Sequence, residues 1–210
     1  MALVSAADDV LIVVDVQYDF LPGGRLAVAG GDEIIEPINA IARRFGNVVL
    51  TQDWHPEDHL SFASNHEGAK PFEMIELPYG PQILWPDHCV IGSKGAEFSA
   101  LLDIPEAQLV IRKGFRATVD SYSAFQEADR RTKTGLAGYL RERGFHRVFL
   151  AGLATDFCVS WSALDSRAAG FETLIIEDAT RPIDTNNSLA EAWAAMDAAG
   201  VQRIQISDVL

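Results

Sequence analysis

One cysteine of the chain stands where a thiol could act as a nucleophile. Cys158 lies in the segment GLATDFCVS (residues 152–160), shortly after an apolar run that is typical of a β-strand. If a tight turn and the start of a helix follow this strand, the positive end of the helix dipole favours the thiolate, which is the nucleophilic form. The alternative interpretation is a small buried side chain, because free cysteines are usually buried.

Asp15 and Lys113 also follow apolar runs, and each could assist such a thiol. Lys113 is a candidate for the cation that lowers the pKa of the thiol further. Asp15 could take the proton from the thiol and later deliver it to a leaving group. Backbone N–H groups in the turn before Cys158 could hold a developing oxyanion. Taken singly, Asp15 could instead cap the end of a strand, and Lys113 could be a solvated charge.

A second group of residues has the donor types of a metal site. Asp53 and His55 stand two positions apart after an apolar run, and residues at this spacing point to the same side of an extended segment. His88 could join them from the far end of the following loop, and His59 is a further candidate, either as a ligand or as a neighbour of the ligands. One carboxylate and two imidazoles suit a divalent metal with open positions, such as Zn²⁺, Fe²⁺ or Mn²⁺. The alternative is a set of loop histidines that bind backbone groups.

The elements that must position these residues alternate between strand-like and helix-like patterns. Short apolar runs predict six strands, at residues 10–14, 47–51, 109–112, 147–151, 173–176 and 202–206. Helical spacing and terminal glycines predict helices at 32–45, 134–144, 157–170 and 188–200. This alternation indicates a parallel α/β sheet. Because functional residues in such sheets lie outside the carboxyl ends of the strands, we expect Asp15, Asp53, Lys113 and Cys158 to meet in one cleft.

Residues 55–97 form a long stretch without a regular period, rich in proline, glycine and aromatic residues. Loops of this length are usually functional or disordered. Its central part, residues 65–84, could shape the mouth of a pocket or contact another subunit. His66 and His146 stand apart from the clusters above, and we expect them at the surface.

The composition is that of a globular protein and argues against several classes of function. Hydrophobic residues make up 48% of the 210 residues and charged residues 22%, and we expect one domain over residues 1–210. The net charge of −13 disfavours nucleic acid and anionic membranes as partners, since both attract basic surfaces. No apolar run approaches the roughly 20 residues that span a bilayer.

The cysteine content and the N-terminus predict a cytoplasmic protein. Cys89 and Cys158 are too few for a disulfide framework, so we expect reduced thiols, although one bridge between them stays open. The N-terminal sequence MALVSAADD lacks a basic region, and we expect no signal peptide. The oligomeric state is also open, a homo-oligomer included.

Five segments resemble the motifs of the nicotinamidase/pyrazinamidase family, within the isochorismatase-like cysteine hydrolases. The resemblance runs from about residue 11 to about residue 206, and the motifs follow one another in the family's order. Together they are far more specific than any one alone. The segments are VVDVQYDFLPGG (13–24), TQDWHPEDH (51–59), WPDHC (85–89), RKG (112–114) and GLATDFCV (152–159).

The resemblance implies a fold and a set of catalytic roles. The fold would be a Rossmann-like three-layer sandwich, with a six-stranded parallel sheet flanked by helices. Cys158 would attack a carboxamide carbon and form a thioester, Asp15 would be the general base and acid, and Lys113 would support both. The N–H groups of Ala154 and Cys158 would form the oxyanion hole, with a cis peptide bond between Leu153 and Ala154.

The resemblance also implies the substrate and the metal. The enzyme would be an amidohydrolase that converts nicotinamide to nicotinate and ammonia for NAD recycling, and pyrazinamide would be a second substrate. Phe20, Trp85 and Tyr122 match aromatic positions that hold the ring in similar enzymes, although each could also be a core residue. One divalent ion on Asp53, His55 and His88, with Zn²⁺ expected before Fe²⁺ or Mn²⁺, would bind the ring nitrogen.

Three other interpretations remain. Isochorismatases and other amide hydrolases of the superfamily share the Asp, Lys and Cys motifs, but they generally lack the Asp-x-His and His metal set that this chain has. A non-catalytic binding module on this fold would be signalled by loss of the cysteine or the lysine, and both are present. A thiol-redox protein would be expected to carry a C-x-x-C pair, which the sequence lacks.

Overall fold

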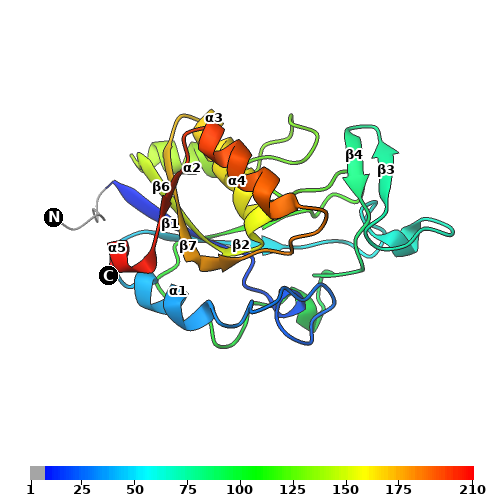
Figure 1. Ribbon diagram of the computed structural model, residues 1–210, viewed down its shortest axis with the longest axis horizontal. Coiled ribbons are helices and arrows are strands. Elements are labelled where there is room, and N and C mark those ends of the chain that lie inside the picture. The colour runs from blue at the N-terminus through cyan, green and yellow to red at the C-terminus, as the bar shows by residue number, and fades with distance from the viewer. Residues whose placement is uncertain (1–7) are drawn as a thin grey trace.

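The apolar runs of the sequence form one parallel β-sheet in the computed structural model, which describes residues 8–210 (Figure 1). Neighbouring strands are parallel throughout, in the order β5-β2-β1-β6-β7-β8. The inner strands are buried on both faces, as continuous apolar runs predict. The prediction of a six-stranded parallel sheet is confirmed. The strands are β1 (Asp9–Val14), β2 (Val48–Asp53), β5 (Leu109–Lys113), β6 (Arg147–Leu153), β7 (Glu172–Arg181) and β8 (Gln202–Ile204).

Helices cover both faces of this sheet, so the predicted three-layer sandwich is also confirmed. Helices α1 (Ile35–Ala42) and α5 (Ile206–Val209) lie below the sheet in the view of Figure 1. Helices α2 (Leu136–Glu142), α3 (Ser160–Ala168) and α4 (Ser188–Ala198) lie above it. No helix among residues 8–210 is long and apolar enough to cross a membrane.

Some boundaries differ from the sequence prediction. Helix α1 is shorter than the predicted 32–45, because Pro37 lacks a backbone N–H and fits only the first turn, where N–H groups need no helical partner. The last strand was predicted to reach residue 206, but it ends at Ile204 and helix α5 begins at Ile206. A capping box explains this helix start, since Gln205 and Asp208 satisfy each other's backbone N–H groups. Residues 1–7, which carry most of the expected non-signal N-terminus, lie outside the described part of the chain.

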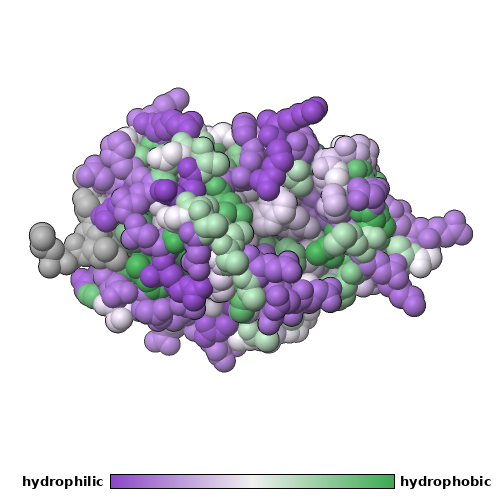
Figure 2. Space-filling model, turned by 45° about the horizontal axis from the view of Figure 1, so that its top comes forward, coloured by the Kyte–Doolittle hydropathy of each residue, from purple (hydrophilic) through white to green (hydrophobic). Residues whose placement is uncertain are grey.

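The long stretch between β2 and β5 contains a hairpin that the sequence analysis missed. Strands β3 (Met74–Leu77) and β4 (Gly80–Ile83) pair antiparallel and stand beyond the carboxyl ends of the sheet strands (Figure 1). Short 3-10 turns at Ala63–Asn65 and Lys94–Ala96 flank it. Figure 2 shows apolar surface at this end of the molecule, where Phe72 and Met74 are exposed.

Strands β1 and β6 approach each other closely at Gly152. This residue lies opposite Val14 in the register of the two strands and has a φ of +117°. A Cβ atom at this position would lie 2.1 Å from the carbonyl oxygen of Val14. Only glycine therefore allows the two strands to meet where they lead to Asp15 and to the turn of Cys158.

We expect Gly152→Ala to lower the free energy of unfolding by about 2–4 kcal/mol, through backbone strain and the clash with Val14. The matched control is Gly138→Ala in helix α2, where a Cβ atom would meet nothing within 4 Å. In this control the free energy of unfolding should rise by about 0.5–1 kcal/mol, because alanine has a higher helix propensity than glycine. Urea unfolding followed by circular dichroism measures both, and equal stabilities of the two variants would contradict the packing argument.

Candidate active site

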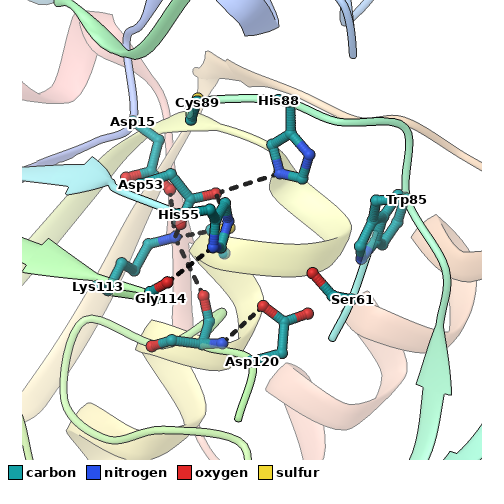
Figure 3. Close-up of polar contacts among 12 residues, drawn as sticks. Asp15, Asp53, His55, Ser61, Trp85, His88, Cys89, Lys113, Gly114 and Asp120 are labelled. Atoms are coloured by element: carbon teal, nitrogen blue, oxygen red, sulfur yellow. Dashed lines mark hydrogen bonds and ion pairs between the residues drawn. The ribbon is translucent and has the colours of Figure 1, made fainter. Parts of the chain in front are cut away.

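The expected residues meet at the carboxyl edge of the sheet (Figure 3), where Asp53 and Cys158 line one pocket and Asp15 and Lys113 lie buried beside it. Asp15 follows β1, Asp53 and Lys113 end β2 and β5, and Cys158 lies in a π-helical turn between β6 and α3. The residues that line the pocket are Phe20, Leu26, Asp53, His55, Trp85, His88, Asp120, Ser121, Tyr122, Ala154, Phe157, Cys158 and Ile183. The prediction that residues at the ends of separate strands lie close together in space is therefore confirmed for these four side chains.

Lys113 is the centre of the catalytic candidates and is completely buried. Its Nζ atom lies 2.8 Å from Oδ2 of Asp15 and 2.6 Å from Oδ1 of Asp53. The same atom lies 3.3 Å from Sγ of Cys158. A buried ammonium group is stable only when it is paired, and the two carboxylates provide that pairing.

The pKa of the Cys158 thiol differs from the sequence prediction. Burial raises this pKa well above its ordinary value, and the lowering effect of Lys113 is opposed by Asp15 and Asp53. The sequence analysis considered the helix dipole and one cation, but burial and the two carboxylates depend on tertiary packing. A raised pKa favours the thiol over the thiolate, and a thiol needs a proton acceptor before it can attack.

Asp15 has the properties of that acceptor. Burial raises the pKa of its carboxyl group, while Lys113 opposes the rise. The hydroxyl of Thr51 donates a 2.6 Å hydrogen bond to Oδ1 of Asp15 and fixes the side chain. Thr51 was missed from the sequence, although it opens the TQDWHPEDH segment, since it lies within a predicted strand. A carboxylate with a raised pKa is a better base near neutral pH.

Asp53, His55 and His88 form the predicted metal cluster. Oδ2 of Asp53 lies 3.3 Å from Nε2 of His55 and 3.6 Å from Nε2 of His88. The Nδ1 atoms of the two histidines face carbonyl oxygens, of Gly114 at 2.9 Å and of Pro86 at 2.8 Å. Because a carbonyl only accepts, each Nδ1 carries the hydrogen, and a neutral ring then directs the lone pair of Nε2 toward Asp53.

This donor set fits a divalent metal ion. Two Nε2 lone pairs and a carboxylate oxygen converge on one point, and all three side chains are buried. Burial lowers the pKa of His55, but the charge of Asp53 and its hydrogen bond outweigh this effect, and the net pKa is raised. The position therefore favours a positive charge. Either a proton or a cation satisfies that preference, and a carboxylate with two imidazoles is a common ligand set for Zn²⁺.

Gly114 is required beside this cluster. Its φ is +69°, and a Cβ atom there would lie 2.3 Å from Cε1 of His55. The glycine of the RKG motif therefore brings its carbonyl against the histidine ring, which a larger residue would displace.

His59 lies next to the cluster but its ring nitrogens are already engaged. Nδ1 lies 2.7 Å from the hydroxyl of Ser61, and Nε2 lies 3.3 Å from the carbonyl oxygen of Val119. Burial and the nearby His55 lower its pKa to about 4. His59 is also close enough to His55 and Asp120 to form a second potential ligand group. As it stands in this structure, His59 is a hydrogen-bonded neighbour of the three-residue cluster.

The three aromatic residues singled out in the sequence all line the pocket. Phe20 packs against His88, with ring centroids 5.5 Å apart. Nε1 of Trp85 donates a 2.9 Å hydrogen bond to the hydroxyl of Tyr122. Phe157 packs edge-on against Trp85 at 5.0 Å and was missed, although it stands next to Cys158 in the motif.

Other features of the pocket could be predicted only in part from the sequence. Asp120 and Ser121 line the pocket from the loop after β5 but lie well beyond the strand end at Lys113, so the strand-end argument did not reach them. Ala154 and Cys158, the candidates for the oxyanion hole, both line the pocket. The peptide bond between Leu153 and Ala154 is cis, as the resemblance implies. His146 is exposed and His66 is half-buried, bound to the carbonyl of Leu60.

A parallel sheet with a thiol, a lysine and a carboxylate at its carboxyl edge is the arrangement expected of an isochorismatase-like hydrolase. The pattern of the isochorismatase domain family matches residues 9–208, and the chain belongs to this family. Among its relatives is the nicotinamidase of Acinetobacter baylyi (strain ATCC 33305 / BD413 / ADP1). It is 59% identical over 200 residues, which are 95% of this chain and 94% of the relative.

Solved structures give the same picture. A nicotinamidase/pyrazinamidase from Acinetobacter baumanii superposes with a TM-score of 0.96 at 60% identity, over 97% of this chain and 99% of that one. A protein from L. infantum in complex with nicotinate gives 0.87 at 41% identity, over 100% and 99%. A Pyrococcus horikoshii pyrazinamidase in complex with zinc gives 0.78 at 37% identity, over 94% and 99%.

We expect the lowered pKa of His59 to appear as a pH dependence of stability in metal-free protein. Between about pH 6.5 and about pH 4 the unfolded chain binds a proton at His59 that the folded chain does not. The free energy of unfolding should therefore fall by about 2–4 kcal/mol as the pH decreases through this window. Urea unfolding of the wild type and of His59→Gln at several pH values isolates this contribution. Parallel pH profiles of the two proteins would contradict it.

Proposed function

We propose that the protein is an amidohydrolase that converts nicotinamide to nicotinate and ammonia, and that it also accepts pyrazinamide. One observation carries this proposal: a single pocket is lined by the Cys158 thiol, the Asp53, His55 and His88 cluster, and aromatic side chains. A flat aromatic carboxamide with a ring nitrogen has one chemical group for each of these. The similarity to nicotinamidases over almost the whole chain supports the same substrate.

Cys158 is the proposed nucleophile. Its Sγ atom attacks the carboxamide carbon while Asp15 takes the thiol proton, and this step gives a tetrahedral adduct. Asp15 then delivers the proton to the amide nitrogen, the C–N bond breaks, and ammonia leaves a thioester on Cys158. Lys113 holds the carboxylate of Asp15 and lies 3.3 Å from the sulfur, where its charge stabilises the developing thiolate. Water then releases nicotinate from the thioester.

The oxyanion and the ring would be bound by separate parts of the pocket. The N–H groups of Ala154 and Cys158 are the proposed donors to the oxyanion, since both residues line the pocket next to the sulfur. Phe20, Trp85 and Tyr122 are the proposed walls for the pyridine ring.

Asp53, His55 and His88 would hold one divalent ion, with Zn²⁺ proposed before Fe²⁺ or Mn²⁺. The ion would supply a Lewis acid for the ring nitrogen of the substrate. The ligand chemistry described above and the zinc complex of the P. horikoshii relative support this choice.

We also propose that residues 1–210 act as a single hydrolase domain in the cytoplasm, in the recycling of NAD. The match to the family over residues 9–208 supports the single domain. Cys89 and Cys158 are both free thiols, which agrees with a reducing compartment.

The decisive experiment measures ammonia release from nicotinamide by the purified protein, before and after chelator treatment and after metal is added back. Metal-dependent release is the expected result. Absence of release, with metal bound and Cys158 reduced, would contradict the proposal and would point to another amide or ester as the substrate.

We expect Cys158→Ala to lower kcat by at least about a thousandfold, because no other group replaces the nucleophile. The fold should remain, as checked by circular dichroism. The control is Cys89→Ala, which removes the only other cysteine and should retain turnover. Activity of Cys158→Ala comparable to that of the control would exclude the thioester route.

We expect His88→Ala to lose bound metal, because it removes one of the three converging donors. A matched control is His146→Ala, which replaces an exposed histidine far from any ligand group. Elemental analysis after dialysis measures the metal content of both variants. Equal metal content in both would contradict the ligand assignment.

A further inference from the structure

The β3–β4 hairpin reaches the active site through one buried polar side chain. Most residues of this hairpin are exposed or half-buried, but Gln82 of β4 is only 2% exposed. Gln82 lines a groove beside the pocket, and its amide is directed toward residues that line the pocket itself. A buried amide must find hydrogen-bond partners, so its partners show what the hairpin is attached to.

The amide of Gln82 binds two pocket residues at once. Its Nε2 lies 2.7 Å from Oδ2 of Asp120 and 2.9 Å from the hydroxyl of Tyr122. The carbonyl oxygen of Ile83, at 2.6 Å, is a third acceptor for the two hydrogens of this amide. The hydroxyl of Tyr79, at the turn of the hairpin, donates to Oε1 of Gln82 at 3.0 Å. Since a carboxylate only accepts, the amide has one orientation, with the nitrogen toward the pocket.

The hydroxyl of Tyr122 joins this network to the aromatic wall. It also accepts the 2.9 Å hydrogen bond from Nε1 of Trp85. Gln82 and Trp85 therefore hold the same oxygen from two sides, and the rings of Trp85 and Tyr122 meet at an angle of 78°. Rotation about the Cα–Cβ bond of Tyr122 would move this oxygen and break both contacts, so the hydrogen bonds fix where the ring lies.

We propose that Gln82 is a positioning residue for substrate binding, through which the β3–β4 hairpin holds Tyr122 and Trp85 as one wall of the pocket. This proposal rests on the proposed function. It also chooses between the two roles that the sequence left open for residues 65–84, in favour of shaping the pocket.

The proposal predicts an effect on binding rather than on chemistry. The described partners of Gln82 are Asp120, Tyr122, Tyr79 and Ile83. Those of Lys113 are a separate set: Asp15, Asp53, Ser121 and Cys158. A wall that holds the ring acts on the substrate and on the transition state alike. Loss of such an interaction raises KM and leaves kcat unchanged.

The test compares Gln82→Leu with the wild type and with Glu76→Gln, an exposed position on the same hairpin. We expect Gln82→Leu to raise KM for nicotinamide about tenfold with kcat within about twofold of the wild type, the size expected for a lost buried hydrogen bond. Glu76→Gln should leave both constants unchanged. A wild-type KM in Gln82→Leu, or an equal fall of kcat in both variants, would overturn the proposal.

A double-mutant cycle with Tyr122→Phe separates positioning from a general loss of stability. Because Tyr122→Phe already lacks the shared oxygen, adding Gln82→Leu should raise KM by less than about threefold more. If the KM of the double variant rises by the product of the two single effects, the residues act independently and the proposal is overturned. If Gln82→Leu does not fold, Tyr79→Phe removes the donor to Oε1 of Gln82 and should raise KM by a few-fold.

Binding of nicotinate to the zinc-loaded proteins, measured by calorimetry, distinguishes failure of this proposal from failure of the proposed function. If the wild type binds nicotinate without hydrolysing nicotinamide, the proposed function fails, and weaker binding by Gln82→Leu still supports the positioning role. If the wild type hydrolyses nicotinamide and Gln82→Leu binds nicotinate as tightly as the wild type, only the positioning role fails. A wild type that does neither would overturn both.

Discussion

The buried ammonium group of Lys113 is the interaction on which the rest of the site depends. A charge that is taken out of water costs several kcal/mol, and Lys113 is tolerated because two carboxylates lie within 2.8 Å of its nitrogen. Those carboxylates are themselves buried and would be equally costly without the lysine. The cluster joins the ends of β1, β2 and β5, and the register of β2 with β5 places Asp53 directly opposite Lys113. The buried charges are therefore neutralised only when the strands pair in the correct register.

The charged side of the pocket faces an apolar one. Phe20, Trp85 and Phe157 give the pocket an apolar lining, and electrostatic interactions are stronger beside apolar groups than in water. The same burial that raises the pKa of Cys158 also raises that of Asp15, so the pKa values of the thiol and of its proposed proton acceptor shift in the same direction. Proton transfer between them then depends on the difference of the two values rather than on either value alone.

The parts of the molecule that could be predicted from the sequence are those that depend on local pattern. Apolar runs located the sheet, and the rule that functional residues follow strand ends joined Asp15, Asp53, Lys113 and Cys158. The hairpin was missed because its strands have only four residues each, and the apolar and polar residues of MIEL and GPQI do not alternate regularly. Asp120 and Thr51 escaped because their roles come from contacts with residues distant in the chain. The predicted lowering of the pKa of Cys158 was wrong for the same reason, because the burial that raises this pKa is a property of the assembled fold.

Asp53 divides its two oxygens between the halves of the site: Oδ1 binds Lys113 and Oδ2 faces the two histidines. One delocalised charge thus serves as a counter-ion on one side and, in the proposed metal site, as a ligand on the other. An asparagine or alanine at this position perturbs both sides together, so a deep mutational scan cannot assign its effect to either. For enzyme redesign, this carboxylate is the residue that prevents the proposed ion-binding half from being exchanged independently of the proposed nucleophilic half.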